Sequence, residues 1–336
     1  MRAVVLVGGL GTRLRPLTLT RPKQMLPIVN RPMIEHVVGH LTRHGIDDVV
    51  LSLGYRPDGF RRAYPDTCAG ARLHYAVEPE RLDTAGAISF AARDAGIDER
   101  FVVVNGDVLT DLDLTSFLAF HERSGAEGTI ALHKVDDPSR YGVVPTDPDG
   151  RVLTFVEKPP PGTAPSSMIN AGTYALEPDV LDRIVPGRPT SVEREVFPGM
   201  VADGSLYAVD DQAYWIDTGS PQEYIQAQLD LLDGLRGLVD PAEAVDRTAA
   251  VAPDARVTRS VVGPGSIIGP GARVEDAVLL DRVVVEPRAV VVGSVVGSGT
   301  TVGEGARVVG CSVVGDGQVV GPGERLDGVR RPEACG

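Results

Sequence analysis

The stretch AVVLVGGLGTRLRPLTLTRPKQMLP, residues 3–27, places a glycine-rich turn directly after a short apolar run. The run from Ala3 to Val7 is typical of a buried strand. Glycines after a strand let backbone N–H groups approach phosphate oxygens, and the arginines and lysine that follow neutralise phosphate charge. The spacing matches neither GxxxxGK[ST] nor GxGxxG. We interpret the stretch as a turn that binds a polyphosphate; the alternative is an ordinary strand-to-helix turn with surface arginines.

The size and charge of the chain limit the classes of protein to which it can belong. Its 336 residues, 43% of them apolar, are enough for a sizeable core and for two domains. The net charge of -13 argues against nucleic acid or an anionic membrane as a partner, because a polyanion is repelled except at a local basic patch. A phosphate site in this chain must therefore be a focused pocket.

The first residues and the cysteines bear on the cellular compartment. The apolar run near Met1 is too short for the core of a signal peptide, and no stretch approaches a membrane span, so we expect a cytoplasmic protein. Cys68, Cys311 and Cys335 are scattered, odd in number and without metal-ligand spacing. We expect them to be reduced thiols without a functional role.

Up to about Gly237, short apolar runs alternate with helix-length amphipathic segments, which predicts an α/β fold. We expect a Rossmann-like mixed, mostly parallel sheet flanked by helices. In such sheets ligands bind at the carboxyl ends of the strands, where Gly8 and the Asn105-Gly106-Asp107 motif both fall. Strands are expected over Ala3–Val7, Asp48–Leu53, Phe101–Val104 and Thr129–His133, and helices over Met33–His44, Thr84–Ala95 and Leu114–Ser124.

The last third of the chain has a different spacing of apolar residues and glycines. Apolar residues recur at steps of about six, with glycine-rich turns between them, a period that predicts a C-terminal left-handed parallel β-helix of hexapeptide repeats. An irregular β-sandwich is the alternative. We divide the chain into an α/β domain (1–237), a linker (238–250), the β-helix (251–326) and a tail (327–336). The residues expected to face inward are Val262, Ile268, Val274, Leu279, Val285, Val291, Val296, Val302, Val308, Val314 and Val320.

The histidines limit what the β-helix can do. Acyltransferases built on such helices usually need a histidine base, and all six histidines of this chain precede the repeats. We therefore expect the β-helix to mediate homo-oligomerisation, as a dimer or larger, through flat Val-rich faces or a stacking end; the alternative is that it only stabilises the chain. His36, His40 and His44 are spaced for a metal site on a helix, but no nearby carboxylate or cysteine completes one.

Together with later segments, the opening stretch resembles the sugar-1-phosphate nucleotidyltransferases, and most closely the mannose-1-phosphate guanylyltransferases (GDP-mannose pyrophosphorylases). Each motif is weak alone, but their joint order is specific and covers nearly all of the chain, β-helix included. Pro189–Pro198 is especially similar to the guanylyltransferase branch. The other motifs that carry the resemblance are Gly8–Thr18, Lys23–Pro27, Leu82–Ala87, Asn105–Asp107, Tyr141–Val144, Phe155–Pro159, Asn170–Gly172 and Trp215–Gly219.

The resemblance implies a reaction and a set of phosphate-binding residues. A sugar 1-phosphate oxygen attacks the α-phosphorus of a nucleoside triphosphate, and pyrophosphate leaves, so alignment and charge neutralisation dominate catalysis. Lys23 would lie between the two reacting phosphates and Arg13 would stabilise the departing pyrophosphate. Mg²⁺ is the implied cofactor, with Asp107 and Asp217 as its ligands; a turn or cap role is the alternative for both. We expect Arg15 and Arg21 to be solvated surface residues.

The nucleotide site implied by the resemblance comes from the first part of the chain. Glu78 occupies the position that reads the base, and a carboxylate that only accepts hydrogen bonds suits guanine rather than adenine. Asp83 stands where family members commonly have glycine, and an aspartate is strained there if the backbone needs a positive φ. The implied nucleotide-binding residues are Leu6, Gly8, Gly9, Gly11, Thr12, Arg13, Glu78, Asp83, Gly86 and Asp107.

The sugar side implied by the resemblance centres on the Glu157-Lys158 pair, with the carboxylate accepting from sugar hydroxyls and the ammonium pairing with the phosphate. Neighbours in a strand point to opposite faces, so the strand must end or twist there if both contact substrate. Pro159 favours such an end, and a surface ion pair is the alternative. The implied sugar-phosphate-binding residues are Gly142, Glu157, Lys158, Asn170 and Gly172.

The implied activity is transfer of GMP from GTP to a sugar 1-phosphate, most closely α-D-mannose 1-phosphate, giving GDP-mannose and pyrophosphate. Three alternatives remain open: another triphosphate such as ATP or dTTP, another sugar or cyclitol 1-phosphate such as glucose 1-phosphate, and a catalytically silent regulatory subunit that binds an NDP-sugar. The complete set Arg13, Lys23, Asp107, Lys158 and Asp217 argues against a silent subunit.

Overall fold

The computed structural model describes residues 1–54, 57–210, 212–235 and 241–333. The chain divides into two compact units: Met1–Gly9 with Ile34–Trp215, and Leu10–Met33 with Ile216–Gly336. The expected domain end at Gly237, the start of the linker at Leu238, and Cys335 in the tail lie outside the described residues. Segment 10–33, which holds most of the opening stretch, therefore groups with the repeats.

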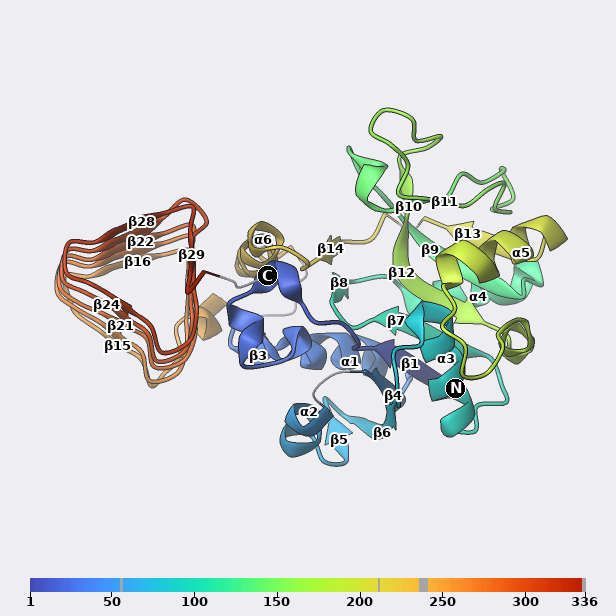
Figure 1. Ribbon diagram of the computed structural model, residues 1–336, viewed down its shortest axis with the longest axis horizontal. Coiled ribbons are helices and arrows are strands. Elements are labelled where there is room, and N and C mark those ends of the chain that lie inside the picture. Colours follow the sequence, from blue (N-terminus) through green and yellow to red (C-terminus); the bar gives the residue numbers. More distant parts are fainter. Residues whose placement is uncertain (55–56, 211, 236–240, 334–336) are drawn as a thin grey trace. The chain divides into compact units, whose positions relative to one another are not determined.

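The first unit is built on a ten-stranded mixed sheet, ordered β11-β10-β12-β7-β1-β4-β6-β5, with β9 pairing β12 and β13 (Figure 1). Strand β1 pairs in parallel with both β4 and β7, and β4 pairs in parallel with β6, which confirms the Rossmann-like fold. Strand β12 is antiparallel to β7 and β9. The strands of this sheet are β1 Arg2–Leu6, β4 Asp48–Leu53, β5 Thr67–Cys68, β6 Ala71–Val77, β7 Phe101–Asn105, β9 Gly128–Lys134, β10 Gly142–Val143, β11 Val156–Glu157, β12 Met168–Leu176 and β13 Leu206–Val209. Strand β8 Val108–Thr110 lies outside this sheet.

Helices accompany this sheet, and the predicted helices and strands agree with the structure to within one residue at each end. Helix α4 begins where Asp113 accepts from the N–H groups of Thr115 and Ser116, and it ends at Gly125 with φ 62°. Phe101, Tyr174 and Phe197 are buried in the core. The helices are α1 Met33–Arg43, α2 Pro57–Ala63, α3 Asp83–Asp94, α4 Leu114–Ser124, α5 Phe197–Asp203, the short η4 Pro138–Arg140 and η5 Pro178–Arg183, and the π-helical turn η6 Val192–Val196.

The second unit contains the predicted β-helix, formed by three five-stranded parallel sheets (Figure 1). Parallel pairing throughout these sheets excludes the β-sandwich, and all eleven residues expected to face inward are buried in one core. The sheets are β15 Ala250–Val251, β18 Ile267–Ile268, β21 Val284–Val285, β24 Thr301–Val302 and β27 Val319–Val320; β16 Arg256–Thr258, β19 Arg273–Glu275, β22 Val290–Val292, β25 Arg307–Val309 and β28 Arg325–Asp327; and β17 Val261–Val262, β20 Val278–Leu279, β23 Val295–Val296, β26 Val313–Val314 and β29 Arg330–Arg331.

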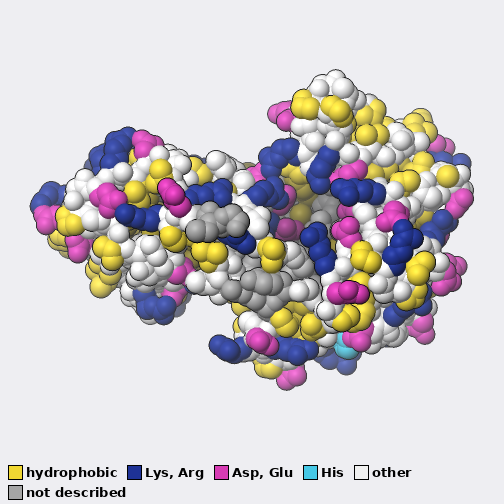
Figure 2. Space-filling model, in the orientation of Figure 1, with side chains coloured by type: hydrophobic (Ala, Val, Ile, Leu, Met, Phe, Trp, Pro, Cys, Tyr) yellow, Lys and Arg dark blue, Asp and Glu magenta, His cyan; other side chains and the backbone are white. Residues whose placement is uncertain are grey.

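The three outer faces of the β-helix differ in chemistry. The β16–β28 face carries paired charges such as Arg273 with Glu275 and Arg325 with Asp327. Figure 2 shows basic and acidic side chains interspersed over this part rather than gathered by sign. The outward positions of the β17–β26 sheet are buried, including Val278 and Val295.

The remaining elements of the second unit flank the repeats. Helix α6 begins at a Ser220 cap, and its buried Gln228 accepts from the N–H of Val29 and donates to the carbonyl of Pro27. These bonds fix the turn of the β2–β3 hairpin. None of the helices in the described ranges combines the length and apolar character needed to cross a bilayer. The elements are η1 Thr12–Leu14, η2 Leu17–Leu19, η3 Lys23–Met25, β2 Pro27–Ile28, β3 Arg31–Pro32, β14 Trp215–Asp217, α6 Pro221–Leu232 and η7 Pro241–Ala244.

Candidate nucleotide and sugar-phosphate site

The glycine-rich turn starts at the carboxyl end of β1. Leu6 pairs with Ser52 and Asn105 on the two neighbouring strands, and its carbonyl accepts from the N–H of Gly106 at 2.9 Å. A Cβ added at Gly8 or Gly9 would meet no atom within 4 Å, so their backbone is open to a ligand. Gly9 has φ 112°, a conformation that side chains rarely adopt. This geometry suits backbone recognition of phosphate.

The turn continues in the second unit, where it is packed rather than open. Gly11 has φ 57°, and a Cβ there would lie 3.0 Å from Cγ2 of Thr18. The Thr18 hydroxyl also donates to the Gly11 carbonyl at 2.8 Å. Gly11 therefore allows Thr18 to close the loop, while Thr12 and Arg13 remain exposed on η1.

Arg13, Lys23 and Asp217 are brought together. The Lys23 ammonium lies 3.5 Å from Oδ1 of Asp217, and the Arg13 guanidinium lies 3.9 Å from Oδ2. The Lys23 side chain is only 6% exposed, so its charge requires a compensating carboxylate. Sequence reasoning assigned no role to Gly219, where a Cβ would stand 2.5 Å from Nη2 of Arg13. A larger residue at this position would displace the guanidinium.

Glu78 follows β6 and is engaged by its own chain. Its Oε2 accepts from the N–H of Leu82 at 3.1 Å, and Oε1 accepts from the Ser52 hydroxyl at 3.3 Å. Each carboxylate oxygen has a second lone pair for a ligand. Asp83 has φ 58°, so the condition under which an aspartate is strained at this glycine position is met.

The N-terminus of α3 is capped from a distant segment that sequence reasoning did not connect to it. The Thr190 carbonyl accepts from the N–H groups of Ala85 and Gly86 at 2.8 and 3.1 Å. A Cβ at Gly86 would stand 3.0 Å from the carbonyl of Arg188, so close packing explains this glycine without a nucleotide. Thr84 donates from its hydroxyl to Glu193 at 2.7 Å. No local pattern encodes this long-range contact.

On the sugar side, β11 ends at Glu157 and Lys158 turns to φ 48°, so the two neighbours do not alternate as they would in a continuing strand. The Lys158 ammonium lies 2.9 Å from Oε1 of Glu157, and its side chain is 60% exposed. The surface ion pair, which was the alternative to substrate binding, is thus present. Both side chains still have surface exposed to a ligand. Gly142 faces Glu157 in register, and a Cβ there would stand 2.5 Å from Cζ of Phe155, which makes glycine a packing requirement.

Asn170 and Gly172 belong to an irregular stretch of β12. Asn170 accepts from the N–H of Gly172 and donates to the Tyr174 hydroxyl, both at 2.9 Å. Gly172 has φ 76°, and a Cβ there would collide with the Asn105 amide. Trp215 donates to the Ala171 carbonyl at 2.8 Å. These bonds fix the Asn170 amide beside a rigid backbone.

Asp107 lies in the turn between β7 and β8 of the first unit, and Asp217 ends β14 in the second. Within the described ranges, no three His, Cys, Asp or Glu side chains are arranged to hold a metal ion. Each unit thus offers one carboxylate, the kind of ligand that Mg²⁺ accepts together with substrate phosphates. The His40 and His44 rings instead contact each other edge to face.

Arg21 was expected to be a solvated surface residue, and Cys68 a reduced thiol without a functional role. Arg21 is not a solvated surface residue: its guanidinium pairs with Asp316 at 3.0 Å and is 27% exposed. The expectation was wrong because the partner lies far along the chain. Cys68 is buried, and burial together with the nearby Glu35 carboxylate raises the pKa of its thiol to about 12, which keeps the thiol protonated.

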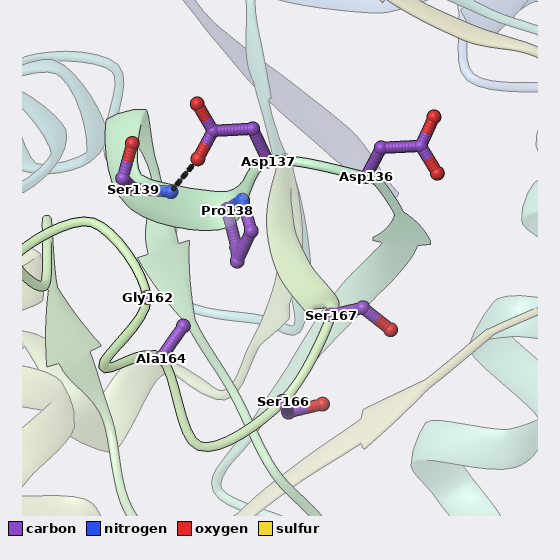
Figure 3. A pocket seen from close by; sticks show the side chains of 8 residues that line it. All are labelled: Asp136, Asp137, Pro138, Ser139, Gly162, Ala164, Ser166 and Ser167. Atoms are coloured by element: carbon purple, nitrogen blue, oxygen red, sulfur yellow. Dashed lines mark hydrogen bonds between the residues drawn. The ribbon is translucent and has the colours of Figure 1, made fainter.

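An open pocket of about 300 Å³ is lined by residues other than those predicted for the site (Figure 3). Asp137 accepts from the N–H of Ser139 on one wall, and Ser166 and Ser167 line the opposite wall. None of the eight lining residues was expected to bind substrate. The pocket therefore adds nothing to the candidate site.

Two family models match this chain. The Nucleotidyl transferase family matches residues 2–234, and the GMPPB C-terminal domain matches residues 239–329. A mannose-1-phosphate guanylyltransferase of Mycobacterium tuberculosis is 41% identical over 84% of this chain and 80% of its own length. A mannose-1-phosphate guanyltransferase of Schizosaccharomyces pombe is 44% identical over 70% of this chain and 66% of its own.

Solved structures agree as well. The crystal structure of HddC from Yersinia pseudotuberculosis has a TM-score of 0.60 and 31% identity, covering 68% of this chain and 99% of its own. A putative glucose-1-phosphate thymidylyltransferase from Bacillus anthracis, 24% identical, has a TM-score of 0.63 over 71% of this chain and 96% of its own, which supports the fold alone. The chain belongs to the nucleotidyl transferase family.

Proposed function

We propose that this enzyme transfers GMP from GTP to α-D-mannose 1-phosphate and releases pyrophosphate. A phosphate oxygen of the sugar 1-phosphate forms a bond to the α-phosphorus of GTP, and the bond from that phosphorus to the leaving pyrophosphate oxygen breaks. The observation that carries the proposal is the buried Lys23 held 3.5 Å from Asp217, with Arg13 on the other carboxylate oxygen. Relatives named for this reaction support it.

The residues of the phosphate site have distinct tasks in this proposal. The open backbone at Gly8 and Gly9 would donate to the triphosphate, and Arg13 would stabilise the leaving pyrophosphate. Lys23 would meet the charge of the transferring phosphoryl group at short range. Asp107 and Asp217 would hold Mg²⁺, which neutralises phosphate charge when bound.

The sugar site would use the exposed pair. Lys158 would exchange its Glu157 partner for the sugar phosphate, and the released carboxylate would accept from sugar hydroxyls. The Asn170 amide, held by Gly172 and Tyr174, would contact another hydroxyl. The Lys158 ammonium and the Glu157 carboxylate, which contact each other in the structure, would thus bind the phosphate and the sugar of the same ligand.

Guanine selection would rest on Glu78, a carboxylate that accepts from N–H donors of the base. A solved relative, HddC from Yersinia pseudotuberculosis, 31% identical, was obtained in complex with GMP-PN, which supports a guanine nucleotide. We assign catalysis to the domain of residues 1–237 and assembly to the β-helix. The strands of the β-helix run from Ala250 to Arg331, so the repeats extend beyond the expected bounds of 251–326 into the last residue of the expected linker (238–250) and into the expected tail (327–336).

The β-helix has one outer row that suits assembly of a homo-oligomer. Parallel pairing aligns outward residues of successive coils on the β15–β27 face. Ile267 is 50% and Val319 66% exposed there. This uncharged row, β-branched in all but its first residue, is suited to pack against its own copy. Ile267→Lys is expected to reduce the mass measured by light scattering; an unchanged mass would exclude this face.

A substrate panel tests the proposed reaction. Pyrophosphate release is measured with GTP, ATP and dTTP against mannose, glucose and cyclitol 1-phosphates, using the wild type, Lys23→Ala and Lys134→Ala. Lys134 is an exposed lysine at the end of β9 and serves as the matched control. Loss of the transition-state contact is expected to lower kcat about 100-fold or more in Lys23→Ala, with Lys134→Ala unchanged. Preference for ATP or dTTP would contradict the assignment to Glu78, and absence of turnover would favour a silent subunit.

A further inference from the structure

The segment that carries Arg13 and Lys23 has little regular structure of its own. Residues 10–33 contain three single-turn helices and a hairpin of two two-residue strands, and they belong to the same compact unit as the β-helix. Elements this short are not stable on their own, although apolar side chains of the segment such as Leu14 and Leu26 are fully buried. The position of Lys23 must therefore be determined by other parts of that unit.

One turn of the β-helix makes direct polar contacts with this segment. Oδ2 of Asp316 accepts from the guanidinium of Arg21 at 3.0 Å and from the hydroxyl of Thr20 at 2.6 Å. The same guanidinium donates to the Ser298 hydroxyl on the preceding coil at 2.8 Å. The Asp316 side chain is 17% exposed, so solvent screens this ion pair weakly.

The turn around Asp316 has the shape this contact requires. Its other oxygen, Oδ1, accepts from the N–H of Ser298 at 2.8 Å, which fixes the carboxylate on the repeat itself. Beside it, a Cβ added at Gly315 would stand 3.0 Å from Cβ and Cγ of Pro16. Glycine at this position lets the segment approach the coil. The contact is therefore made at two separate points of the segment.

A second anchor holds the other side of Lys23. Buried Gln228 of α6 accepts from the N–H of Val29 at 2.6 Å and donates to the Pro27 carbonyl at 2.8 Å. The Tyr224 hydroxyl donates to the same carbonyl. Lys23 follows the Arg21 anchor by two residues and precedes Pro27 by four. Lys23 therefore lies in a short segment that is held by hydrogen bonds on both sides, at Arg21 and at Pro27.

We infer that Asp316, on the β-helix, is a positioning residue for Lys23. This inference rests on the proposed function, because it assigns Lys23 to the reacting phosphates. Asp316 contacts no reacting atom; it fixes Arg21, and through the chain it fixes the distance of the ammonium from the phosphoryl group. A displacement of about 1 Å at such a group costs about 100-fold in rate, so a partial loss of the anchor lowers kcat more than it alters substrate binding.

The test compares Asp316→Asn with Asp327→Asn. Asp327 also pairs with an arginine of the β-helix, Arg325. Among the described residues, its carboxylate makes no hydrogen bond or ion pair to segment 10–33. Asp316→Asn is expected to lower kcat about 10-fold while KM for GTP changes less than about 2-fold, and to raise hydrogen exchange in residues 12–26. Asp327→Asn is expected to leave all three quantities at the wild-type values.

A charge reversal separates positioning from loss of folding. The variant that combines Arg21→Asp with Asp316→Arg restores the ion pair in reverse, without the hydrogen bonds that Asp316 accepts from Thr20 and Ser298. It is expected to recover part of the kcat that either single change loses, at equal melting temperature. A reversed pair as slow as the single variants, or Asp316→Asn with wild-type kcat, would overturn the inference. If the wild type transfers no guanylyl group, the proposed function fails; unchanged exchange in residues 12–26 of Asp316→Asn would then refute the anchor independently.

Discussion

Two lysines of this molecule are assigned to phosphate, and they are held in opposite ways. Lys23 is 6% exposed, lies 3.5 Å from Asp217 and is tied through the chain to a β-helix turn and to α6. Lys158 is 60% exposed, lies on a turn after β11 and pairs with its own neighbour Glu157. A fixed cation suits the phosphoryl group being transferred, whereas a mobile cation suits capture of a diffusing sugar phosphate.

The largest expected difference between the two sites is their tolerance of arginine. Lys23→Arg replaces a compact buried ammonium by a larger, planar guanidinium. This variant is expected to lower kcat about 100-fold. Lys158→Arg keeps the charge at an exposed position and is expected to change KM for the sugar phosphate less than about 5-fold. Steady-state kinetics on both substrates measure the contrast. Equal losses in the two variants would erase the proposed distinction.

A smaller difference is expected in stability. Asp217→Asn leaves the buried Lys23 ammonium without its carboxylate and is expected to lower the free energy of unfolding by about 2 kcal/mol, less than a fully buried pair because Asp217 is 19% exposed. Glu157→Gln removes the partner of an exposed lysine and is expected to cost less than about 0.5 kcal/mol. Urea unfolding measures both. A cost at Glu157 as large as that at Asp217 would contradict the contrast in burial.

The smallest expected effect is the response to salt. Raising ionic strength from 0.05 to 0.3 M shortens the Debye length about 2.4-fold and is expected to raise KM for the sugar phosphate about 2- to 3-fold through the exposed Lys158. The rate constant of the chemical step, measured in single turnovers at saturating substrate, is expected to stay constant because Lys23 is shielded. A salt-sensitive chemical step would show that Lys23 is exposed during turnover.

Local patterns predicted much of this fold. The β-helix was predictable because each inward residue, such as Val291 or Val308, repeats at a fixed step and is buried only by neighbouring coils. The helices followed from apolar periodicity and caps, as at Asp113. The resemblance raised a positive φ at Asp83 as a condition, because family members commonly have glycine there, and the structure meets that condition.

The rest depends on pairs far apart in the sequence. Nothing near Arg21 indicates an acidic partner at Asp316, and nothing near α3 indicates that Thr190 caps its first amides. Packing also explains Gly86 and Gly142 without a ligand, which a motif alone does not reveal. Whether the remaining predicted residues contact substrate stays a prediction, because ligand contacts are not encoded in backbone geometry.

The membership of residues 10–33 in the second unit has a consequence for engineering. The peptide chain leaves the first unit after Gly9, returns at Ile34 and leaves it again after Trp215. A hybrid enzyme that takes its repeats from a relative by a single cut after the α/β domain would separate the opening segment from the coil to which it is fitted. A functional hybrid has to take both residues 10–33 and residues 216–336 from the same relative.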